Sequence, residues 1–148
     1  MKKIHYVLLG VVLAFVICIA VGLFMYFKPH KNISESKPDI ILKASELFKA
    51  FETNETDATK KFVTGDPTIQ VLGIVDEINK NQDTTATIIL RNVAEYNGCI
   101  TCTIDKSQFT KLDKFQKGTP IIIKGQCSGA QELVEKEIVM IRCIIVEK

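Results

Sequence analysis

The feature that most constrains this chain is a long apolar run near its start. Residues 4–27 read IHYVLLGVVLAFVICIAVGLFMYF and contain no Asp, Glu, Lys or Arg. At 1.5 Å rise per residue, a helix of this length spans about 36 Å, enough to cross a hydrocarbon core of about 30 Å. We therefore expect residues 1–31 to form a membrane anchor, with its helix over 4–27, and the remaining residues to form one globular domain.

A cleavable signal peptide is the alternative interpretation of the run. Signal peptides have an apolar core of about 7 to 15 residues, followed by small residues at the cleavage site. Here Ala20 and Gly22 are followed by LFMYF before the first charge at Lys28, which favours an uncleaved anchor. Cys18 follows Ile17, where a lipoprotein needs a small residue, so we expect Cys18 to be an ordinary apolar helix residue.

Charge does not decide which side of the membrane the domain faces. Lys2 and Lys3 precede the run, while Lys28, His30 and Lys31 follow it. The two flanks are therefore nearly balanced under the positive-inside rule, in which acidic residues count little.

Beyond residue 31 the chain is slightly acidic. All 17 Asp and Glu lie there, against 15 basic residues once Lys2, Lys3, Lys28 and Lys31 are set aside from the 19 Lys and Arg. Nucleic-acid-binding domains usually carry a net basic face, so this balance argues against that function. The same part contains no histidine and no Gly-rich phosphate loop. We therefore expect no catalytic residues, no cofactor and no enzymatic activity.

The segment that follows the apolar run divides into a linker and a helical part. Residues 32–41 are mostly polar and include Pro38, which is typical of a linker. The globular domain, with this helical part at its start, is expected to occupy residues 42–148. Between 42 and 62, apolar residues recur at three- and four-residue steps, which predicts an amphipathic helix or two helical pieces, with an irregularity at Thr53 and Asn54. These apolar residues are Leu42, Leu47, Phe48, Phe51, Ala58 and Phe62.

From residue 69 the apolar period changes to two. Strands are predicted over 69–78, 84–92, 99–104, 119–129 and 137–146, with turns over 79–83 and 94–98. A short helix over 106–118, to which Phe109 and Phe115 belong, is predicted to plug the barrel. Three strands, a helix and two more strands, with Gly73 and Gly125 inside strands that must bend, is the order of an OB-fold. The predicted fold class is mainly β with helices, a five-stranded OB-fold barrel behind a leading amphipathic helix and a transmembrane helix.

Two blocks of residues carry a family resemblance. The first is ASELFKAFETNETDATKKF followed by VLGIV, and the second is LDKFQKGTPIIIKGQCSG with a final CIIV. Over residues 44–146 the chain resembles the tRNA-anticodon-like (tRNA_anti-like) OB-fold family of bacterial exported and membrane-anchored proteins. The matching residues are Glu46, Leu47, Phe51, Asn54, Glu55, Ala58, Phe62, Gly73, Gly118, Gly125, Cys127 and Gly129.

The resemblance implies an OB-fold and export across the bacterial inner membrane. Together with the uncleaved apolar run, it favours a single-pass protein with its N-terminus inside and residues 32–148 outside. It carries over no catalytic residues.

Cys99 and Cys102 have the spacing of half a zinc site or of a redox dithiol. In a strand, Ile100, Cys102 and Ile104 share one face while Cys99 lies on the other, so the two sulfurs point apart. A zinc site would need two further ligands at the same ion, and a redox dithiol would need a helix N-terminus. We therefore expect no metal site here.

Cys127 and Cys143 are expected to face the core from the last two strands. Lys124, Gln126 and Arg142 are expected to face water, and alternation then turns both cysteines inward. The predicted inward neighbours are Ile121, Ile123, Val139, Ile141 and Ile145. In an exported domain these two cysteines are expected to oxidise to a disulfide. In a cytoplasmic domain they would remain buried thiols.

Two function classes remain. The first is a membrane-anchored, extracytoplasmic OB-fold module that binds a protein, peptide or glycan. The second is an oligonucleotide binder, which would stack bases on aromatic side chains and contact phosphates through residues such as Lys80, Arg91 and Lys124. The predicted strands carry no Phe, Tyr or Trp, so the interaction module is favoured and nucleic acid is the less favoured partner.

Overall fold

A computed structural model describes residues 2–26, 33–81, 84–91, 98–132 and 134–146. Within the first helix, side chains are described for residues 10 and 12–23. The chain separates into two compact units, Met1–Lys31 and Asn32–Lys148. Most of the turn predicted over 94–98, and residues 82–83 of the turn predicted over 79–83, lie outside the described residues.

The first unit contains helix α1 (Lys2–Tyr26). Its described apolar side chains are exposed on every side of the helix, with Val12 58%, Phe15 69% and Ile19 49% exposed. Over the described residues, no helix is found that is both long and apolar enough to cross a membrane.

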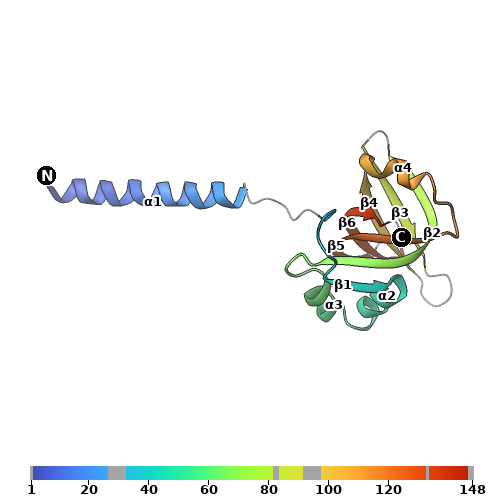
Figure 1. The fold of residues 1–148 in the computed structure, drawn as a ribbon. Coiled ribbons are helices and arrows are strands. Elements are labelled where there is room, and N and C mark those ends of the chain that lie inside the picture. Colours follow the sequence, from blue (N-terminus) through green and yellow to red (C-terminus); the bar gives the residue numbers. More distant parts are fainter. Residues whose placement is uncertain (1, 27–32, 82–83, 92–97, 133, 147–148) are drawn as a thin grey trace. The chain divides into compact units, whose positions relative to one another are not determined.

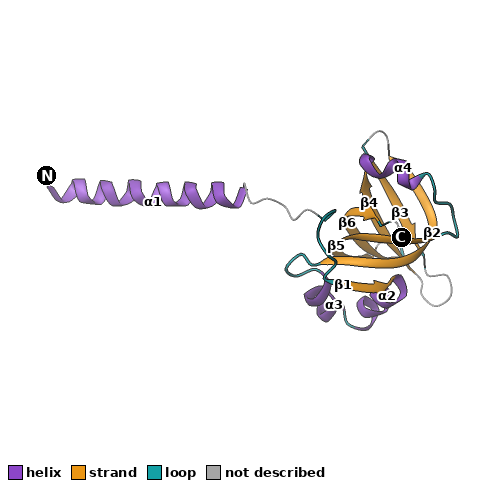
Figure 2. Ribbon diagram, in the orientation of Figure 1, coloured by secondary structure: helices purple, strands orange, loops and turns teal. Residues whose placement is uncertain are grey.

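The second unit contains a closed barrel of five strands (Figures 1 and 2). Neighbouring strands pair in the order β2, β3, β4, β6, β5, and pairing of β2 with β5 closes the ring. All pairs are antiparallel except β4 with β6. This is the topology of an OB-fold, and that prediction is confirmed. The strands are β2 (Thr68–Asn81), β3 (Thr85–Leu90), β4 (Gly98–Asp105), β5 (Pro120–Glu132) and β6 (Lys136–Ile145).

A further strand, β1 (Ile40–Lys43), runs parallel to the first half of β2. The linker predicted over 32–41 therefore ends in regular structure. Asp39 explains the difference, because its N–H donates to the Thr68 carbonyl oxygen at 2.8 Å and its carboxylate accepts from the Thr68 N–H at 2.8 Å. These two bonds align the chain with β2 just before β1 begins.

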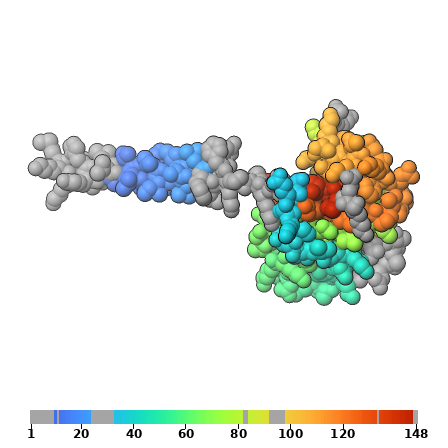
Figure 3. Space-filling view, viewed as in Figure 1, coloured from blue at the N-terminus to red at the C-terminus, as the bar shows by residue number. Residues whose placement is uncertain are grey.

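Two short helices follow β1, α2 (Ala44–Thr53) and α3 (Glu55–Phe62). Asn54 separates them, because its side-chain oxygen accepts from the Asp57 N–H at 3.2 Å and caps α3. The irregularity predicted at Thr53 and Asn54 is confirmed. In Figure 3 the cyan-to-green residues of β1, α2 and α3 gather on one side of the domain. Leu42, which the periodicity placed in the same set, lies in β1 and is only partly buried. The buried apolar residues of α2 and α3 are Ala44 and the five others predicted, Leu47, Phe48, Phe51, Ala58 and Phe62.

The helix between β4 and β5 is shorter than predicted. It consists of a 3₁₀ turn, η1 (Lys106–Gln108), followed by α4 (Phe109–Leu112). Leu112 is the residue that enters the core, at 1% exposed, whereas Phe109 and Phe115 are only partly buried against it. The helix thus covers the barrel interior mainly through Leu112, with Phe109 and Phe115 packed against the core beside it.

A bulge in β6 changes which of its residues face the interior. Arg142 has φ 52°, and the register shifts there, so Met140 and Cys143 both face inward although three positions apart. The predicted inward orientation of Cys143 is confirmed. Val139 and Ile141 were expected inward as well, but Val139 is only partly buried and Ile141 is 39% exposed. Simple alternation fails because the bulge adds one residue to the strand.

Gly98 joins the helical layer to the barrel, and a side chain there should destabilise the fold. A Cβ atom at Gly98 would overlap the Phe48 ring and the Lys136 carbonyl oxygen. We expect Gly98→Ala to lower the free energy of unfolding by about 1–3 kcal/mol, the usual cost of overpacking. Chemical denaturation of the full chain in detergent measures this, with Ser128→Ala at an exposed site as control. Equal stability of the two variants would contradict the role given to Gly98.

Candidate ligand-binding groove

The face that OB-folds generally use for ligands is formed here by β3 and β4. Thr87 lies opposite Thr103, and Ile89 opposite Thr101. All four side chains are partly exposed on the outside of the barrel. The described residues of these two strands include no aromatic side chain. Base stacking, a usual source of affinity for single-stranded nucleic acid, therefore has no platform on this part of the face.

Arg91, next to the end of β3, is held by carboxylates. Its Nε lies 3.1 Å from Asp76 Oδ2 and its Nη1 lies 3.0 Å from Glu135 Oε2, while Lys117 Nζ lies 2.8 Å from Asp76 Oδ1. The hydrogen bond from Lys117, and then that from Arg91, lowers the pKa of Asp76. The hydrogen bond to Asp76 raises the pKa of Arg91, and Glu135 adds to this. Two cations and two carboxylates thus compensate one another at this site.

Lys124 and Gln126 lie inside the domain, although the sequence predicted that both face water. Lys124 is 8% exposed, and its Nζ donates to the carbonyl oxygens of Ser34 at 3.1 Å and Ser36 at 2.9 Å. Gln126 is 6% exposed, and its Nε2 donates to the Asp66 carbonyl oxygen at 3.3 Å. The prediction is wrong because distant chain segments cover this part of β5 and supply the acceptors.

Lys80 completes the set of basic residues that the sequence suggested for phosphate contacts. Its Nζ lies 2.5 Å from Asp113 Oδ1 and 5.6 Å from the centre of the Phe109 ring. Lys124 is buried, and Lys80 and Arg91 are ion-paired. None of these three residues therefore offers an uncompensated positive charge on the barrel surface.

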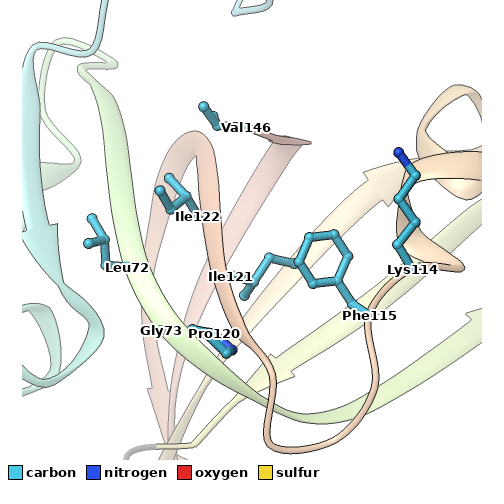
Figure 4. A pocket seen from close by; sticks show the side chains of 8 residues that line it. All are labelled: Leu72, Gly73, Lys114, Phe115, Pro120, Ile121, Ile122 and Val146. Atoms are coloured by element: carbon cyan, nitrogen blue, oxygen red, sulfur yellow. The ribbon is translucent and has the colours of Figure 1, made fainter. Parts of the chain in front are cut away.

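An apolar groove lies elsewhere, where β2 and β5 pair. Leu72 and Ile122 are register partners on these strands, and both line the groove together with Phe115 and Lys114 (Figure 4). Its volume is about 630 Å³, within the range of about 300–1,000 Å³ that is common for ligand sites. The full lining is Leu72, Gly73, Lys114, Phe115, Pro120, Ile121, Ile122 and Val146.

A smaller hollow of about 250 Å³ shares Leu72 and Gly73 with this groove and is also lined by Lys43, Ile74 and Arg91. Leu72 is 38% exposed and Ile74 is 46% exposed. Strand β2 thus presents apolar side chains between two hollows, with Lys114 in the lining of the larger and Lys43 in that of the smaller. Apolar surface beside positive charge suits an apolar ligand that carries a carboxylate.

The cysteines of β4 lie as predicted, on opposite faces of the strand. Cys102 is 0% exposed, while Cys99 is partly exposed with its Sγ 4.0 Å from Thr101 Oγ1. Cys127 and Cys143 are both buried free thiols, and the disulfide predicted between them stays a prediction. Among the described residues, no group of three His, Cys, Asp or Glu side chains is placed to hold a metal ion.

Comparison with known families decides the family of this chain. The family called tRNA_anti-like matches residues 1–145. The chain belongs to the tRNA_anti-like family. The family suggested by the two sequence blocks is thereby confirmed, with a match that also includes the N-terminal apolar run. No curated protein is significantly similar in sequence to the chain.

Solved structures resemble this chain at low sequence identity. A Klebsiella pneumoniae subsp. pneumoniae MGH 78578 lipoprotein, predicted by its name to bind nucleic acid, matches 81% of this chain and 100% of its own, with 12% identity and a TM-score of 0.58. A predicted aspartyl-tRNA synthetase from Leishmania major Friedlin has 12% identity over 87% of this chain and 26% of its own, with a TM-score of 0.48. Entamoeba histolytica asparaginyl-tRNA synthetase has 13% identity over 76% of this chain and 25% of its own, with a TM-score of 0.44. Likeness at such identity shows the fold alone.

The groove was not predicted from the sequence. The runs VLGIV and PIII are apolar at consecutive positions, so both faces of each strand carry apolar side chains. A strand of this kind is expected to be covered on both faces, yet the outer face here is partly exposed at Leu72 and Ile74. A barrel strand turns only one of its faces to the interior. Consecutive apolar residues in such a strand therefore indicate that its outer face is apolar as well.

The buried ammonium of Lys124 should be important for stability. We expect Lys124→Met to lower the free energy of unfolding by about 1–3 kcal/mol, because two carbonyl oxygens lose a charged donor. Thermal and chemical unfolding of the full chain measure this, with Lys106→Met at an exposed position as the matched control. If both variants unfold like the unchanged protein, Lys124 does not secure residues 34–36.

Proposed function

We propose that this protein is a membrane-anchored OB-fold binding module whose groove between β2 and β5 holds an apolar segment of a peptide or protein that ends in a carboxylate. The observation that carries the proposal is the groove itself, in which Leu72, Ile122, Phe115 and Val146 provide apolar surface and Lys114 provides positive charge. Sites that bind small ligands commonly combine such a lining with few polar groups. The proposed role is binding rather than catalysis.

A single-stranded nucleic acid is the second candidate ligand. The name of the Klebsiella pneumoniae lipoprotein favours it, and so does a group of lysines around α4, at Lys106, Lys111, Lys114 and Lys117. Against it stand the threonine-rich β3–β4 face and the pairing of Arg91 with carboxylates. We therefore place nucleic acid second.

The proposal extends to the location of the protein. Helix α1 contains a run without charged residues, and its described apolar side chains are exposed on every side. A helix of this kind is more stable when lipid, rather than water, surrounds its side chains. We propose a single-pass protein of a bacterial inner membrane, with an uncleaved anchor, the N-terminus inside and residues 32–148 outside the cytoplasm.

The groove can be tested with acetyl-leucyl-phenylalanine, an apolar dipeptide with a free carboxylate. Methyl NMR of the full chain in nanodiscs should show saturable shifts for Leu72, Ile122 and Val146, while Ile89 on the other face stays unchanged. Lys114→Glu should weaken binding by roughly fivefold, about 1 kcal/mol for a surface charge pair. Lys106→Glu is the matched control.

Two further measurements separate the candidate ligands. The amidated dipeptide should bind more weakly than the acid, because it lacks the carboxylate. Labelled single-stranded oligonucleotides should bind the same nanodisc sample no more tightly than about 10⁻⁶ M. Tight binding that falls steeply with salt and is weakened by Lys111→Glu or Lys117→Glu would place nucleic acid first. Shifts confined to Ile89 would refute the groove.

The location can be tested with protease added to intact cells whose outer barriers have been permeabilised. We expect residues 32–148 to be degraded while a short fragment that contains α1 remains in the membrane. A cytoplasmic marker protein must stay intact as the control. Protection of the domain from external protease would overturn the proposed orientation.

A further inference from the structure

Three thiols lie in the interior of the barrel, each on a different strand. Cys102 on β4 is 0% exposed, Cys143 on β6 is 1% exposed and Cys127 on β5 is 5% exposed. Since β6 pairs with both β4 and β5, the Cys143 thiol has a cysteine-bearing strand on each side. Cys143 could therefore form a disulfide with Cys102 or with Cys127.

The bulge at Arg142 determines the position of Cys143. Its Sγ lies 2.6 Å from the point where a Cβ atom would stand on Gly125. The absence of a side chain at Gly125 thus makes room for this sulfur beside β5. On the other edge of β6, Cys143 is the register partner of Ile104, whose inward neighbour along β4 is Cys102.

The two candidate partners differ in where their sulfurs point. The Cys143 Sγ donates to the Ile141 carbonyl oxygen at 3.6 Å, and the Cys102 thiol lies close enough to raise the pKa of Cys143 more strongly than the Cys127 thiol does. The register partner of Cys127 on β6 is Met140, three residues from Cys143. The Gly129 backbone, which lowers the pKa of Cys127, and Gly125, which lies beside the Cys143 sulfur, are two residues from Cys127 in opposite directions along the chain, so the Cys127 sulfur lies on the side away from the Cys143 sulfur.

We infer that Cys102 and Cys143 are the two cysteines of this domain that oxidise to a disulfide, while Cys127 remains a thiol. One thiolate attacks a disulfide of the glutathione class and releases one glutathione thiol. The second cysteine then attacks the mixed disulfide and releases the other thiol. Two protein thiols are thereby oxidised and one glutathione disulfide is reduced to two thiols. This pairing replaces the Cys127–Cys143 bond expected from strand alternation.

The bond should form while the chain folds rather than afterwards. The thiolate is the nucleophile in exchange, and burial raises the pKa of Cys143 and raises that of Cys127 to about 11. The thiols of the proposed pair, Cys102 and Cys143, are also closed to solvent in the folded barrel. Formation in the cell rests on the proposed extracytoplasmic location, because disulfides persist in oxidising compartments, whereas the choice of partners follows from the barrel itself.

The test uses the full chain with Cys18→Ser and Cys99→Ser, which removes the cysteine of α1 and the outward-facing cysteine of β4. The reduced, denatured protein is refolded in detergent with a mixture of oxidised and reduced glutathione. Trypsin cleaves after Arg91, Lys106, Lys124, Lys136 and Arg142 and so places the three remaining cysteines on separate peptides. Mass spectrometry without reductant should find the Cys102 peptide joined to the Cys143 peptide.

A variant and a cellular measurement complete the design. Cys127→Ala should keep the crosslink, and the oxidised protein should melt roughly 10 °C or more above its reduced form, as expected for a closed loop of this length. A Cys127–Cys143 or Cys102–Cys127 crosslink, or three free thiols after refolding, would overturn the inference. Thiols that are free in cells but crosslinked after refolding would leave the pairing intact and refute the extracytoplasmic location.

Discussion

Strand β2 is the element on which the rest of the domain depends. Its first half pairs with β1 on one edge and with β5 on the other, and its second half pairs with β3. The bonds to β5 close the barrel and remove the open edges that a five-stranded sheet would otherwise expose. The inward residues of the same strand, Ile69, Val71 and Val75, lie in the core. Its outward residues Leu72 and Ile74 form the apolar surface beside the groove, so the strand that closes the barrel also lines the proposed ligand site.

The basic side chains of Arg91, Lys80 and Lys124 make their polar contacts with other parts of the domain. Arg91 joins β3 to β2 and to the turn before β6, Lys80 reaches Asp113 after α4, and Lys124 binds the segment before β1. Each contact joins parts of the chain that are far apart in sequence. A barrel face whose charges are compensated in this way has little electrostatic attraction for phosphate, and this is one reason why we propose a peptide or protein ligand before a nucleic acid.

Local patterns were sufficient for much of the fold. The period-two runs predicted all five barrel strands, the apolar spacing predicted both helices with their break at Asn54, and the family resemblance agreed with the match over 1–145. Features that depend on distant residues were missed. Strand β1 forms because Asp39 bonds Thr68, the burial of Lys124 depends on carbonyl groups at Ser34 and Ser36, and the bulge at Arg142 shifts the parity of β6. The groove escaped prediction because consecutive apolar residues in β2 and β5 do not reveal which face is covered.

The contact between Lys124 and residues 34 and 36 has a mechanical consequence. Any tension applied through the N-terminal segment reaches the domain at the buried Ile33 and then at this ammonium group and its two carbonyl acceptors. The next bonds in line are the pair between Asp39 and Thr68, followed by the β1–β2 ladder. Load is thereby passed directly to β5 and β2, the two strands whose pairing closes the barrel, before it reaches α2 and α3. The domain therefore resists pulling at the pairing of β2 with β5, which is also the pairing that closes the barrel.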